Sequence, residues 1–214
     1  MKPVRIFLAD DHRLFRSGLR MMLDRLADIE VIGEADNGLD ALVALKELVP
    51  RVALLDISMP GLNGIELTRR IKQSHPQIVV VILSMHDERA FVLESLRAGA
   101  DGYLLKDAGR EDLARVIHEV LQGRKAVSAA ISSILVDEVL HPATDSGAWK
   151  VLSARERQVL QLIAEGGSTR EIAAGLNLSI KTIESHRKQI MDKLDLHSIA
   201  ELTRYAIREG LSPL

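Results

Sequence analysis

The sequence predicts two domains: an α/β domain with a doubly wound sheet of five parallel strands, and a small all-α domain after it. Three observations predict this organisation. The chain has 214 residues, enough for two separate cores. Short apolar runs alternate with helical patterns through the first part of the chain. The last part shows only helical patterns, with a capping signal at several of their starts.

Five strand-helix units make up the first domain, and their nearly continuous apolar strands are typical of a parallel sheet covered on both faces. In chain order the predicted strands and helices are Val4–Ala9 and a helix from Leu14, Val31–Ala35 and 39–48, Val52–Leu55 and 63–74, Ile78–Leu83 and 89–98, and Gly102–Leu105 and 110–122.

Polar residues stand at the carboxyl ends of four of these strands. They are Asp10 and Asp11, Asp56, Ser84 and Lys106. In a doubly wound sheet these ends share one edge, so we expect the side chains to meet. Converging carboxylates favour a hard divalent cation, and Mg²⁺ suits a site that also accepts phosphoryl oxygens. Asp56 is then a candidate nucleophile that forms an acyl phosphate, with Lys106 and Ser84 contacting the phosphoryl group.

Each of these residues also has a plain structural interpretation. Asp56 is a possible turn residue, Ser84 a strand-end hydroxyl and Lys106 a solvated lysine. The Asp10-Asp11 pair is equally suited to capping a helix. Their joint placement at four strand ends favours the functional interpretation.

The segments LADDH, LLDISMPGLNG, LSMH and GYLLK resemble the receiver domain of bacterial two-component response regulators, over roughly residues 1–122. The resemblance implies a flavodoxin-like fold. It also implies that Asp56 is the phosphoacceptor, that Asp10, Asp11, Asp56 and the Ser58 carbonyl hold Mg²⁺, and that Ser84 and Lys106 take the family's hydroxyl and lysine roles. Tyr103 falls at the family's switch aromatic; without the family it is a half-buried strand tyrosine.

Past residue 122 the strand-helix alternation stops. A helical segment spans about 128–140, and turn-forming residues place a joint at about 141–150. We therefore expect a receiver domain over 1–122, a linker with a helical segment over 123–147, and a second domain over 148–214. Residues 148–214 carry a net charge of +2, against −4 for 1–147.

Capping signals mark helix starts at Ser153, Ser168 and Ser179 in the second domain. Two short helices at 155–165 and 169–175 are followed by a tight turn, a third helix at 180–194 and a fourth at 199–209. A short helix, a turn and a second helix are typical of a helix-turn-helix.

One face of the 180–194 helix is polar. It carries Lys181, Glu184, Ser185 and Lys188, a pattern that also fits a merely solvated surface. The segment from LSARERQV to MDKL resembles the DNA-binding domain of LuxR/NarL transcription factors. That resemblance implies base contacts by Glu184, Ser185 and Lys188, and phosphate contacts by Lys181, Thr182, Arg187 and Arg170. Glu184 either accepts a hydrogen bond from cytosine N4 or only excludes wrong DNA sequences.

Together these resemblances identify the chain as a NarL/FixJ response regulator, a transcriptional regulator rather than an enzyme. They imply phosphorylation by a sensor histidine kinase and binding of promoter DNA, and the small net charge favours a homodimer. Two alternatives remain. A haloacid-dehalogenase-type hydrolase requires a second acidic residue two positions after its nucleophile, where this chain has Ser58. A receiver that serves only for protein interaction does not need the acids or Lys106.

The composition fits a cytoplasmic protein. Hydrophobic residues make up 47% and aromatic residues 3%, and the absence of cysteine excludes disulfides and thiolate metal sites. Two acids follow within eleven residues of the N-terminus, before a signal peptide could develop. The longest apolar run, Ile78–Leu83, is too short to span a membrane.

Overall fold

A computed structural model describes residues 2–26, 28–140 and 151–212, which form two compact units. The predicted joint at 141–150 lies outside the described residues. None of the described helices is long and apolar enough to cross a membrane. The first unit is an α/β domain and the second is all helical, as the sequence predicts.

The sheet of the first unit is parallel throughout, in the order β2-β1-β3-β4-β5-β6. Its strands are β1 (Val4–Ala9), β2 (Ile29–Ala35), β3 (Val52–Asp56), β4 (Val79–Ser84), β5 (Gly102–Leu105) and β6 (Ala126–Val127). This is one strand more than the five predicted. The additional strand, β6, has only two residues, too few for an alternating or apolar pattern to stand out.

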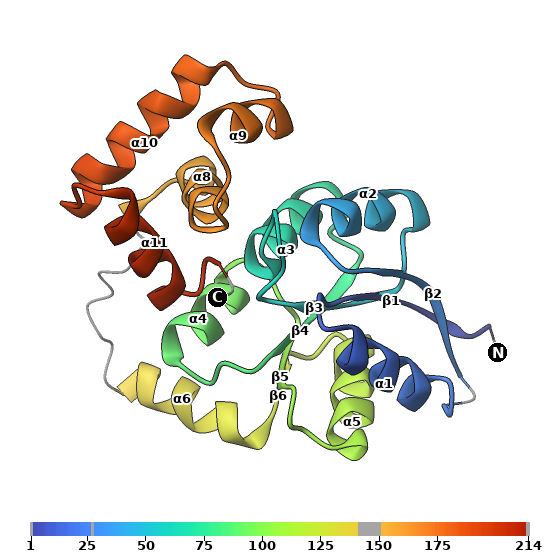
Figure 1. The fold of residues 1–214 in the computed structure, drawn as a ribbon. Coiled ribbons are helices and arrows are strands. Elements are labelled where there is room, and N and C mark those ends of the chain that lie inside the picture. The colour runs from blue at the N-terminus through green and yellow to red at the C-terminus, as the bar shows by residue number, and fades with distance from the viewer. Residues whose placement is uncertain (1, 27, 141–150, 213–214) are drawn as a thin grey trace. The chain divides into compact units, whose positions relative to one another are not determined.

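The helices cover both faces of this sheet (Figure 1). They are α1 (Arg13–Leu23), α2 (Gly38–Leu48), α3 (Gly64–Ser74), α4 (Arg89–Arg97), α5 (Arg110–Leu121) and α6 (Ala129–Leu140). Helices α1 and α5 lie on one face, and α2, α3 and α4 on the other. The helix α6 packs against α4.

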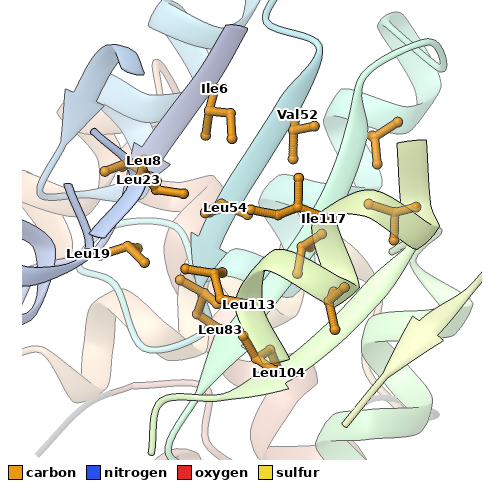
Figure 2. Packing of buried hydrophobic residues seen from close by; sticks show 14 of the residues in the cluster. Ile6, Leu8, Leu19, Leu23, Val52, Leu54, Leu83, Leu104, Leu113 and Ile117 are labelled. Atoms are coloured by element: carbon orange, nitrogen blue, oxygen red, sulfur yellow. The ribbon is translucent and has the colours of Figure 1, made fainter. Parts of the chain in front are cut away.

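The core on the α1 and α5 side is aliphatic (Figure 2). Residues of alternating strand positions, such as Ile6, Leu8, Val52 and Leu54, pack against Leu19 and Leu23 of α1 and against Leu113 and Ile117 of α5. Aliphatic side chains therefore form the hydrophobic core despite the low aromatic content. Burial of these side chains fixes the register of the strands, since a slip of one residue turns every apolar side chain to the other face.

The second unit consists of four helices, α8 (Ala154–Ala164), α9 (Thr169–Gly175), α10 (Ile180–Leu194) and α11 (Ile199–Arg208). Capping boxes begin α8 at Ser153 and α9 at Ser168, and the Ser179 side chain accepts a hydrogen bond from the Thr182 backbone N–H at the start of α10. All three predicted caps are confirmed. A separate apolar core includes Leu160 of α8, Ile172 of α9, Ile183 and Ile190 of α10 and Leu202 of α11.

Candidate functional sites

The structure brings the predicted acids and lysine together at the carboxyl edge of the sheet. Asp10 follows β1, Asp56 ends β3 and Lys106 follows β5. The Lys106 Nζ atom lies 2.8 Å from Asp10 Oδ2 and 2.8 Å from Asp56 Oδ2. It also lies 4.9 Å from the centre of the Phe15 ring. The Lys106 side chain is only 4% exposed, so it is a buried counter-charge and not a solvated surface lysine.

This environment changes the acidity of Asp56. Burial raises its pKa to about 6; Asp10 and Asp11 add to the rise, and the Lys106 ammonium opposes it. The site therefore stabilises a neutral carboxyl more than water does. A further cation would restore the carboxylate by compensating its negative charge.

The loop between β3 and α3 holds Asp56 in place through its backbone. The Asn63 side chain caps α3 by accepting from the Glu66 backbone N–H, and the Gly64 N–H donates to Ile57 at 2.9 Å. A Cβ atom at Gly64 would lie 2.0 Å from the Asp56 carbonyl oxygen. Only glycine allows the start of α3 to approach the end of β3 this closely.

Ser84 and Tyr103 are linked through the segment that follows β4. The Ser84 hydroxyl accepts a hydrogen bond of 3.0 Å from the His86 backbone N–H, and the Tyr103 hydroxyl donates one of 2.7 Å to the His86 carbonyl. Tyr103 is fully buried, so it is not the half-buried tyrosine with a solvated hydroxyl of the alternative interpretation. The ring of His86 stacks on Phe91 of α4.

The acidic edge has the donors for a metal ion. One ligand atom each from Asp10, Asp11, His12 and Asp56 can be chosen within 4.8 Å of one another. Within the described residues, the buried oxygens Asp10 Oδ2, Asp11 Oδ1 and Asp56 Oδ2 make no hydrogen bond, and the Lys106 and His12 side chains form ion pairs with them. Hard carboxylate oxygens with spare lone pairs fit a divalent cation.

Two neighbours of this edge carry no assigned role in the sequence interpretation. His12 belongs to the LADDH segment, and its Nδ1 lies 2.7 Å from Asp11 Oδ1. His86 belongs to LSMH, and its Nε2 lies 3.5 Å from the Ser58 hydroxyl. Both follow an expected site residue closely in sequence, which is the signal that could have identified them.

The residues expected to contact DNA lie on α9 and α10 of the second unit. Arg170 is exposed near the start of α9. On α10, Lys181, Glu184, Ser185 and Lys188 are exposed, whereas Thr182 and Arg187 are half-buried. The exposed four share one face of α10, and the opposite side packs into the core through Ile183 and Ile190. Helices α9 and α10 thus form a helix-turn-helix, and its second helix, α10, exposes a polar face.

Each unit matches a known family. Residues 6–118 match the response regulator receiver domain, and residues 150–206 match the luxR family of bacterial regulatory proteins. The response regulator GacA of Pseudomonas protegens is 38% identical over 208 residues, which cover 97% of each chain.

Solved structures of RcsB have a similar fold. RcsB of Salmonella enterica serovar Typhimurium, bound to the rprA promoter in the presence of the phosphomimetic BeF₃⁻, has a TM-score of 0.65 and 31% identity, covering 95% of this chain and 98% of RcsB. A structure of two RcsB dimers on two parallel DNAs has a TM-score of 0.61 and 30% identity, covering 96% of this chain and 98% of RcsB.

The fold and the acidic edge define the first unit as a receiver domain, and the helix-turn-helix defines the second as a domain of the luxR family. The chain belongs to the NarL/FixJ family of response regulators, which join these two domains. These proteins are transcriptional regulators, so the hydrolase alternative is wrong.

Proposed function

We propose that the chain is a phosphorylation-controlled regulator that accepts a phosphoryl group on Asp56 and binds promoter DNA through α10. The convergence of Asp10, Asp56 and Lys106 at 2.8 Å carries the first half of the proposal. The free polar face of α10 carries the second half. The phosphodonor is a sensor histidine kinase, and the chain acts in the bacterial cytoplasm.

In the phosphoryl transfer, a carboxylate oxygen of Asp56 attacks the phosphorus of the donor. The new O–P bond forms as the P–N bond of a phosphohistidine breaks, and the donor imidazole leaves with the electron pair of that bond. The acyl phosphate carries more negative charge than the carboxylate that it replaces. Lys106 would exchange its ion pair with Asp56 for one with the phosphoryl oxygens, and the Ser84 hydroxyl would donate a hydrogen bond to the same group.

Mg²⁺, when bound, neutralises the carboxylates and the incoming phosphoryl oxygens. We assign it to Asp10, Asp11, Asp56 and the Ser58 carbonyl. The buried acceptor atoms of Asp10 and Asp56 support this assignment, because their ion pairs with Lys106 leave lone pairs free.

Phosphorylation would act on the segment after β4. A reoriented Ser84 hydroxyl gives up its bond with the His86 N–H, while Tyr103 keeps its bond with the His86 carbonyl. These two bonds lie on the same residue, so a change at Ser84 moves the start of α4. We therefore assign Tyr103 the switch role, which shifts an equilibrium between two conformations of the α4 side of the domain.

In DNA binding, α10 would enter the major groove with Glu184, Ser185 and Lys188 facing the bases. Lys181, Thr182, Arg187 and Arg170 would contact phosphates. Since residues 148–214 have a net charge of only +2, one copy neutralises few phosphates. A homodimer that reads two half-sites about one helical turn apart supplies the missing affinity. The domain boundaries that accompany this proposal are 1–122, 123–147 and 148–214.

A mass measurement tests the phosphoacceptor. The full chain is incubated with acetyl phosphate and Mg²⁺, and the intact mass is expected to rise by one phosphoryl group. Asp56→Asn should abolish the rise, whereas the matched control Asp24→Asn, on an exposed acid after α1, should keep it. An unshifted mass in the native chain would favour a receiver that serves only for protein interaction.

Selection from a random DNA pool, with and without acetyl phosphate, tests the regulator. Phosphorylated chain is expected to enrich one repeated half-site and to bind it more tightly in gel shifts at fixed salt. Lys188→Ala should weaken that binding, and Lys46→Ala on α2 removes the same charge from the other domain as a control. Equal binding by treated chain and by Asp56→Ala would refute control by phosphorylation.

A further inference from the structure

The side chain of His12 faces the carboxylates of the acidic edge. Its Nδ1 atom lies 2.7 Å from Asp11 Oδ1, 3.5 Å from Asp10 Oδ1 and 3.9 Å from Asp56 Oδ2. One ring nitrogen therefore approaches all three carboxylates. The side chain is 63% exposed, so an ion from solvent reaches it directly.

Helix formation does not require this orientation. His12 is the N-cap residue of α1, a position where a side-chain oxygen usually accepts a backbone hydrogen bond. The His12 side chain makes no such bond. Its backbone N–H instead donates to Asp10 Oδ1 at 2.8 Å, which holds Asp10 with its other oxygen toward Lys106.

We propose that His12 is a metal ligand, adding one imidazole nitrogen through Nδ1 to the carboxylates of Asp10, Asp11 and Asp56. Ligand atoms from these four residues lie within 4.8 Å of one another, and the buried Oδ2 atoms of Asp10 and Asp56 make no hydrogen bond within the described residues. The ring binds as the neutral tautomer with its proton on Nε2.

A nitrogen ligand changes which cation the site prefers. Mg²⁺ favours oxygen ligands, whereas first-row transition cations bind imidazole well, with affinity rising from Mn²⁺ through Co²⁺ to a maximum at Cu²⁺. The site therefore selects a first-row transition cation over Mg²⁺ more strongly than its three carboxylates alone would. The proposal concerns the same pocket as the proposed phosphoacceptor, but it rests on cation binding without a phosphodonor.

Mn²⁺ binding to the full chain, without phosphodonor, tests the ligand. Pulsed electron paramagnetic resonance of the bound Mn²⁺ should show coupling to one imidazole nitrogen. The coupling should vanish in His12→Gln and persist in His118→Gln, which removes an exposed histidine of α5. Because the His12 side chain neither caps α1 nor lies buried, His12→Gln should keep the native circular dichroism spectrum and melting temperature.

Competition between cations supplies the second measurement. His12→Gln should lower the affinity for Co²⁺ on the order of 10- to 100-fold and leave that for Mg²⁺ within about threefold. An imidazole coupling that persists in His12→Gln, or an equal loss of affinity for both cations, would overturn the proposal. A chain that binds Mn²⁺ through nitrogen yet is not phosphorylated would contradict the proposed function and leave this inference standing.

Discussion

Gly64→Ala tests whether the approach of α3 to β3 holds Asp56 in position. The added Cβ would lie 2.0 Å from the Asp56 carbonyl oxygen, and real Cβ contacts essentially never fall below 3.0 Å, so the backbones must separate by at least 1.0 Å. Overpacking of this kind costs about 1–3 kcal/mol. For a domain of this size each kcal/mol lowers the melting temperature by roughly 3–6 °C.

The same displacement acts on the chemistry. A misplacement of about 1 Å in a reacting group can lower a rate roughly 100-fold. We therefore expect Gly64→Ala to lower the melting temperature and to slow phosphorylation by acetyl phosphate about 100-fold, measured by intact mass over time.

Gly18→Ala is the matched control. Gly18 lies within α1, and a Cβ atom there meets nothing within 4 Å. Alanine is the better helix former, so this variant should gain about 0.5–1 kcal/mol and keep the native phosphorylation rate. If Gly64→Ala melts and reacts like the native chain, the proposed role of this contact is wrong.

Three further substitutions test other contacts. Asp101→Asn weakens the contact with Lys72 Nζ, 2.5 Å from the carboxylate, and should cost about 1.5–3 kcal/mol near neutral pH in thermal melts. Burial raises the pKa of Asp101, but its hydrogen-bond donors lower that pKa by more, so the carboxyl group has a pKa below its ordinary value. The stability advantage of the native chain over Asp101→Asn should therefore shrink as the pH falls below about 4 and the carboxylate gains its proton. Tyr103→Phe leaves the His86 carbonyl without its 2.7 Å donor and should cost about 1–3 kcal/mol in denaturant titrations, while a loss near zero would show that water replaces the hydroxyl. Ser168→Ala removes the N-cap of α9 and should cost about 1 kcal/mol in the melting of the helical domain alone, with phosphorylation of Asp56 unchanged.

The sequence predicts most of the fold because the spacing of apolar residues and the helix-capping residues are local signals. Helices α9 and α10 have the predicted bounds, and β1 and β5 match to the residue. The strand β6 escapes prediction because two residues carry no period, and its pairing with β5 depends on the tertiary fold.

The gathering of the site residues at one edge of the sheet is also predictable, since parallel strands bring their carboxyl ends together. The distances are not predictable. That Lys106 is buried between two acids, or that the His12 ring turns toward them, depends on side-chain directions that no sequence spacing encodes. The need for glycine at position 64 likewise comes from a backbone approach across the β3–α3 loop.

The pairing of Lys106 with Asp10 and Asp56 joins segments from the two ends and the middle of the receiver domain. Lys106 follows β5, whereas the acids follow β1 and β3, and β4 lies between them in the sheet. In a partly folded domain whose β5 has not yet joined the sheet, the acids would lack the Lys106 ammonium as their counter-charge. Under the proposed function, phosphorylation would therefore require the sheet to be complete through β5, and a nascent or damaged receiver would not be phosphorylated.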